Sequence, residues 1–225
     1  MNNIIIKTLE SELMYNETVI LKYKIEYPEI VFGIYEYGQH IFNLYNRRIA
    51  YNLEKKCRNE LYKEAVELYK YNKENGYPVM VYEIVLDYTI TYNRHKIVSL
   101  YSDKYMFTGG AHGNTVREAQ NWNLLIGKMF RLDYLYPNNP YYVIDILKEI
   151  NKQIKEQIEN GSNQYFDNYC ELVLENFKLN NFYMYPKFIE IFFQAYDIAP
   201  YSSGIPTFKI ERGFDNKEIT LNNSN

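Results

Sequence analysis

The stretch from Tyr105 to Leu132 most constrains the fold, because it places two turn signals between β-rich runs. Gly109-Gly110 separates Ile97–Phe107 from Thr115–Leu125. Paired glycines adopt positive φ without a Cβ clash, as tight hairpin connections require. Because the glycine and asparagine that follow also tolerate this region, we expect the connection to run over Thr108–Asn114.

A second turn, at Gly127, joins Asn121–Leu124 to Met129–Leu132. A glycine late in such a short connection is typical of a type I turn closed by a bulge. One further β-rich run, Val79–Tyr92, lies upstream of the run that ends at Phe107, which we expect to begin at Lys96. The sequence therefore predicts a four-stranded antiparallel meander.

Regular elements are also predicted on both sides of the meander. Upstream, strands over Ile4–Leu9 and Val19–Tyr27 precede a long helix over His40–Asn72. Three- and four-residue steps give this helix an apolar stripe made of Phe42, Ile49, Leu53, Cys57, Leu61, Ala65 and Leu68. Downstream we expect helices over Tyr141–Glu159 and Gln164–Phe177, the second capped by Asn163, then strands over Asn181–Tyr185, Phe188–Tyr196 and Thr207–Ile210 that extend the meander.

These elements predict an α+β fold, with an antiparallel β-meander sheet, helices packed on one face and a small N-terminal strand-helix lobe. We expect the N-terminal domain to occupy residues 1–78, continuing to about residue 100, and the C-terminal domain residues 79–212, with a polar tail over 213–225.

Charge and hydropathy exclude several classes of partner. The formal charge of −3 gives no electrostatic basis for binding nucleic acid. No apolar run approaches the roughly 20 residues of a membrane span. The first residues lack a basic segment followed by a long apolar one, so the sequence taken alone predicts no signal peptide and a cytoplasmic location.

Few residues point to chemistry. Cys57 and Cys170 stand in no metal-ligand or redox spacing, and Cys57 lies on the apolar stripe, where we expect a small buried thiol. His112 follows the glycine pair and is the candidate proton shuttle, yet His40 and His95 share no ligand spacing with it. We therefore expect its imidazole to bind loop backbone, and we predict neither a metal nor a cofactor.

Two segments together resemble a known family. The first is Tyr105-Met-Phe-Thr-Gly-Gly-Ala-His-Gly113 with Gly127-Lys-Met-Phe-Arg-Leu132. The second runs from Asn181-Phe-Tyr-Met184 through Phe193-Gln-Ala-Tyr-Asp-Ile-Ala-Pro-Tyr-Ser-Ser-Gly-Ile-Pro206. Both are similar to the extracytoplasmic sensor domain of RsiV-type lysozyme-sensing anti-sigma factors, which also accompanies PdaC-type peptidoglycan deacetylases.

The resemblance spans roughly residues 15 to 210 and implies a non-catalytic binding module with an extracytoplasmic location. Its partner would be a lysozyme-like protein or peptidoglycan, bound by two loops that contain Thr108, Gly109, Gly110, His112, Pro200, Tyr201 and Gly204. Two alternatives stay open: a cell-wall glycan hydrolase or other enzyme that uses His112, and a cytoplasmic protein-interaction scaffold.

Overall fold

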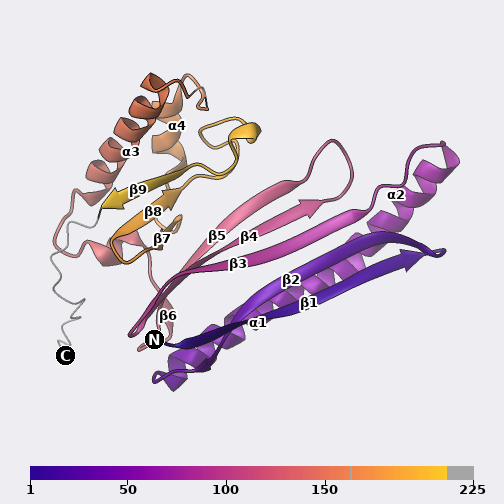
Figure 1. Ribbon diagram of the computed structural model, residues 1–225, viewed down its shortest axis with the longest axis horizontal. Helices are drawn as coiled ribbons and strands as arrows, with labels where there is room; N and C mark the ends of the chain where they lie inside the picture. The colour runs from indigo at the N-terminus through magenta and orange to yellow at the C-terminus, as the bar shows by residue number, and fades with distance from the viewer. Residues whose placement is uncertain (163, 212–225) are drawn as a thin grey trace.

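The computed structural model describes residues 1–162 and 164–211 and contains two separate sheets (Figure 1). The first has six strands in the order β1-β2-β3-β4-β5-β6, and the second has three in the order β7-β8-β9. Helices and strands are mixed along the chain, so the predicted α+β class is confirmed. The predicted cap Asn163 and the predicted tail over 213–225 lie outside the described residues.

The first sheet and its helices take up the N-terminal half of the chain: β1 (Asn3–Tyr15), β2 (Thr18–Phe32), α1 (Glu36–Lys56), one π-helical turn (Cys57–Leu61), α2 (Tyr62–Glu74), β3 (Tyr82–Arg94), β4 (Ile97–Phe107), β5 (Asn114–Asn123) and β6 (Lys128–Met129). The second sheet follows: a 3-10 turn (Leu132–Leu135), α3 (Tyr142–Glu159), α4 (Tyr169–Asn176), β7 (Phe182–Met184), β8 (Phe188–Phe192), a 3-10 turn (Tyr201–Ser203) and β9 (Thr207–Glu211).

The predicted meander is confirmed, since β3, β4, β5 and β6 are successive antiparallel neighbours. Its two turns contain residues with positive φ, a backbone conformation that favours glycine. Gly109 and Gly110 have φ values of +89° and +96°, and Gly127 has φ of +63°. These angles lie where a Cβ would be strained, which is why the turn signals could be read from the sequence.

The N-terminal strands belong to the same sheet as the meander. Leu21–Ile25 of β2 pairs in parallel with Tyr82–Leu86 of β3. A parallel pair needs a long crossover, and α1, the π turn and α2 provide it as they run along one face of the sheet (Figure 1). The predicted apolar stripe faces that sheet, with Phe42 and Cys57 fully buried.

One expectation about the sheets is wrong: the C-terminal strands do not extend the meander. In the described part of the chain, β5 pairs with β4 and otherwise only with the two residues of β6, after which the chain enters a 3-10 segment. The second sheet instead contacts the first through side chains. Ser99 Oγ accepts from the Met184 backbone N–H at 2.8 Å, and Asn121 Nδ2 donates to the Phe182 carbonyl at 2.8 Å.

Buried apolar residues form two clusters. The first lies between the helices and the six-stranded sheet, where Phe42 and Tyr45 pack edge-on against Trp122. The second lies between α3, α4 and the three-stranded sheet. The predicted domain boundary at residue 78 stays a prediction.

Both cysteines are free thiols. Burial raises the pKa of Cys57 to about 11, so this thiol stays neutral near pH 7.

Candidate functional site

The two predicted binding loops meet in space although they belong to different sheets. The first connects β4 to β5, and the second connects β8 to β9. Tyr201 of the second loop donates its hydroxyl to the carbonyl of Gly113 in the first, at 2.7 Å. Its ring also stacks on the His112 imidazole, with ring centroids 4.2 Å apart and planes inclined by 22°. The hydrogen bond from Tyr201 to Gly113 joins residues that are 88 positions apart in the sequence.

Tyr196 also stacks on Tyr201, with ring centroids 5.6 Å apart and planes inclined by 29°. Its side chain is 56% exposed. Its backbone has φ of +70°, a left-handed conformation that costs a bulky residue energy and that recurs at functional sites. We call His112, Tyr201 and Tyr196 the aromatic platform.

The hydrogen bond of His112 defines its tautomer. Nδ1 lies 2.9 Å from the carbonyl oxygen of Gly113. Since a carbonyl can only accept, Nδ1 carries the proton and Nε2 of the neutral ring is left as an acceptor. The residue as a whole is exposed. Within residues 1–162 and 164–211, no group of three or more histidine, cysteine or acidic side chains could hold a metal ion.

The glycines and the proline shape the two loops. A Cβ at Gly109 would lie 3.0 Å from Leu68 Cδ2, so the first loop packs against α2. Thr108 and Gly110 are exposed at its surface. In the second loop, Pro200 precedes the 3-10 turn that contains Tyr201, and Gly204 ends it with φ of +69°.

An ion pair near this site was not predicted from the sequence. Arg117 on β5 donates two hydrogen bonds to Asp103 on β4, at 2.8 and 2.6 Å. Its guanidinium lies 4.1 Å from the Tyr101 ring centroid, and Nη1 donates to the Tyr183 hydroxyl at 3.3 Å. Burial works to lower the pKa of Arg117, but Asp103 outweighs it and the pKa is raised, so the cation persists.

Gln194 fixes the second loop to the edge of β5. Its Oε1 accepts from the Arg117 backbone N–H at 3.0 Å, and its Nε2 donates to the Arg117 carbonyl at 2.7 Å. The side-chain amide thus occupies the position of a neighbouring strand. The Gln194 backbone N–H in turn donates a hydrogen bond to the Asp197 carboxylate at 2.8 Å. These bonds hold the second loop beside the first.

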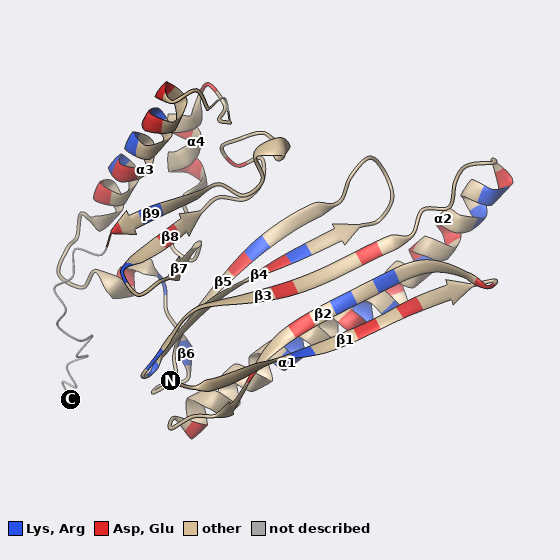
Figure 2. Ribbon diagram, in the orientation of Figure 1, with Lys and Arg blue, Asp and Glu red and all other residues tan. Residues whose placement is uncertain are grey.

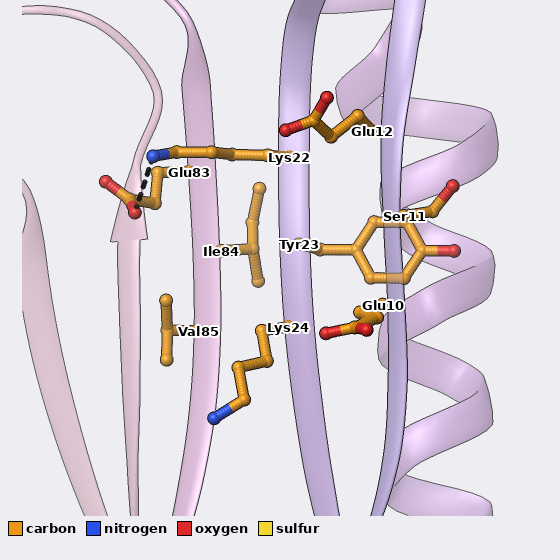
Figure 3. Close-up of a pocket in the computed structure, with 9 residues that line it drawn as sticks. All are labelled: Glu10, Ser11, Glu12, Lys22, Tyr23, Lys24, Glu83, Ile84 and Val85. Carbon is orange, nitrogen blue, oxygen red and sulfur yellow. Dashed lines mark ion pairs between the residues drawn. The ribbon is translucent and has the colours of Figure 1, made fainter.

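A charged groove of about 400 Å³ crosses β1, β2 and β3 (Figure 3). Lys22 reaches Glu83 at 3.0 Å, and Glu12 is the cross-strand neighbour of Lys22 on β1. Figure 2 shows acidic positions on β1 and β3 on either side of basic positions on β2. Because opposite charges neutralise one another across the strands, the groove resembles a solvated sheet surface more than a binding site.

Two regions of the chain match known families. Residues 14–115 match the family described as deacetylase PdaC, and residues 135–213 match a family of unknown function, DUF3298. The N-terminal part of the chain is therefore similar to the PdaC family, and the C-terminal part is similar to DUF3298. This confirms the PdaC part of the predicted resemblance, while the likeness to RsiV-type sensors stays a prediction. No curated protein matches.

Two solved structures share the fold over almost the whole chain. A DUF3298 family member from Bacteroides fragilis superposes with a TM-score of 0.67 at 16% identity, covering 93% of this chain and 91% of that one. A DUF3298 family protein from Pseudomonas aeruginosa gives a TM-score of 0.54 at 17% identity, with the same coverage. In the described part of the chain, no helix is long and apolar enough to cross a membrane.

Proposed function

We propose that this chain is a non-catalytic binding module whose ligand, a lysozyme-like protein or a cell-wall glycan, contacts the aromatic platform. The observation that supports this is the joining of two loops from separate sheets by the bond from Tyr201 to Gly113. A surface assembled in this way is set in place before a ligand arrives, which lowers the entropic cost of binding.

The chemistry of the platform suits such ligands. Tyrosine and histidine rings offer flat contact area with few rotatable bonds to freeze, and they stack on sugar rings or on protein side chains. Tyr196 contributes an exposed ring, and His112 Nε2 contributes a hydrogen-bond acceptor. His112 is thereby given a role in recognition, since its Nδ1 is already bound to Gly113.

The test is calorimetric titration of the whole chain with lysozyme and, separately, with soluble peptidoglycan fragments. Tyr196→Ala is expected to weaken the affinity for the true ligand about tenfold or more, because exposed aromatic anchors dominate such interfaces. Tyr201→Ala is expected to weaken it further, since it also releases the loop from Gly113.

The matched control is Tyr71→Ala, which removes a tyrosine of similar exposure, 57%, from α2. It is expected to leave the affinity unchanged. If a ligand binds and both platform variants retain the full affinity, the platform is not the binding site. If neither ligand binds the unaltered chain, both proposed ligand classes are wrong.

A further inference from the structure

Large apolar side chains are exposed together at the end of the six-stranded sheet farthest from the platform. They are Phe32, Ile34, Tyr37, Leu125, Ile126 and Met129, and we call them the apolar tip. Phe32, Ile34 and Tyr37 are 71%, 76% and 66% exposed. Single exposed apolar residues are ordinary, but a contiguous group marks an interaction site.

Close backbone packing brings the members of the tip together. A Cβ on Gly38 in the first turn of α1 would overlap the carbonyl of Leu124, so the helix start lies directly against the β5–β6 turn. A Cβ on Gly127 would lie 2.9 Å from the Tyr37 ring. Figure 1 shows the start of α1, β6 and the β3–β4 turn gathered at one end of the sheet.

Basic side chains surround the tip. Arg94 and Lys96 lie at the β3–β4 turn, where the Lys96 carbonyl accepts from the Leu124 N–H at 2.7 Å, and Lys128 lies on β6. None of the three takes part in an ion pair within the described part of the chain. Figure 2 shows basic segments at these two places.

Among the residues that the structure describes, acidic groups do not balance these three cations. Glu36 is the acidic residue at the start of α1. Two other carboxylates are already paired, Glu29 with Arg47 at 3.2 Å and Asp133 with Arg131 at 2.7 Å. The end of the sheet is therefore cationic in a chain whose formal charge is −3.

We propose that the apolar tip docks on an anionic lipid surface. The boundary between headgroups and acyl chains accepts exposed aromatic and aliphatic side chains, while anionic headgroups attract the lysines and the arginine around them. A second copy of the chain is a poorer partner, because two tips in contact would bring like charges together. The chain would then lie on the membrane surface without crossing it.

This docking would set the distance between the lipid surface and the platform. β5 runs from the loop that carries His112 to the turn that carries Leu125 and Ile126. Its ten residues, Asn114–Asn123, span about 33 Å at the usual rise of an extended strand. The aromatic platform would face outward at roughly that distance from the headgroups.

The test is co-sedimentation of the whole chain with vesicles of phosphatidylcholine alone and with an equimolar mixture of phosphatidylcholine and phosphatidylglycerol. The chain is expected to bind the anionic vesicles more tightly, and added salt is expected to weaken that binding. The triple variant Arg94→Gln, Lys96→Gln, Lys128→Gln is expected to lose about fivefold in partitioning per charge removed. Phe32→Ser with Ile34→Ser is expected to reduce binding at least as strongly.

Matched controls remove the same side-chain types elsewhere. Lys148→Gln, Lys178→Gln, Lys187→Gln replaces three exposed lysines of the second sheet and its helices, and Leu174→Ser removes an apolar residue that is 66% exposed on α4. Both are expected to bind like the unaltered chain, and circular dichroism verifies that every variant is folded.

Absence of binding to anionic vesicles, or tip variants that bind undiminished, would overturn the proposal. So would a dimer in analytical ultracentrifugation that the tip substitutions dissolve, since the tip would then be a self-interface.

Discussion

Arg117 shows how one side chain joins the two sheets. It pairs with Asp103 across β4 and β5, lies over Tyr101, and donates to Tyr183 of β7. The ion pair could have been predicted, because a hairpin symmetric about Gly110 places residues 103 and 117 directly opposite each other. The bond to Tyr183 could not, since it depends on how the second sheet docks. The positive φ of Tyr196 had no sequence signal either, since tyrosine carries no preference for that region.

Arg117→Ala is expected to lower the free energy of unfolding by about 3 kcal/mol, because it leaves the Asp103 carboxylate without its cation in a largely buried site. The side chains of this pair are 13% and 29% exposed. The control is Arg47→Ala, which breaks the more exposed pair with Glu29 and is expected to cost less than about 1 kcal/mol. Urea denaturation measures both, and equal losses would contradict the assigned role of Arg117.

At the scale of elements, three side-chain amides act as substitutes for a missing strand. In each case the side-chain amide hydrogen-bonds both the N–H and the carbonyl of one backbone residue. The pairs are Asn43 with Ile30, Asn93 with Asn2, and Gln194 with Arg117. Each satisfies backbone groups that an open sheet edge would otherwise expose. The strands themselves were predictable from alternation and turn residues, which are local. The amide contacts join residues up to 91 positions apart, so no local pattern reveals them.

Asn43→Asp tests this role with almost no change in shape. The carboxylate cannot donate to the Ile30 carbonyl, so a partly buried acceptor loses its partner and faces an anion. We expect a loss of about 1–3 kcal/mol in the free energy of unfolding at neutral pH. Asn52→Asp, at an exposed position of the same helix, is the matched control and is expected to change stability by less than about 0.5 kcal/mol. A similar loss in both variants would show that the negative charge, rather than the lost donor, is responsible.

At the scale of the molecule, two sheets contribute to one surface. The meander could be predicted because its turns carry glycines with positive φ, whereas the separate second sheet could not. The strands of the second sheet show the same alternation of apolar and polar residues that an extension of the first sheet would require. The chain leaves the first sheet at the turn after β6, and the sequence does not reveal this. Pro200 and Tyr201 were singled out from the sequence, but their contact with the β4–β5 loop arises from the docking of the sheets.

In the proposed function, both loops bind the ligand as one surface. The most direct measurement is a nuclear magnetic resonance titration of the isotope-labelled chain with the ligand that calorimetry identifies. We expect the backbone amide signals of residues 108–114 and of residues 196–204 to shift together, along one binding curve. Shifts confined to one loop, or located in the charged groove of β1, β2 and β3, would contradict it.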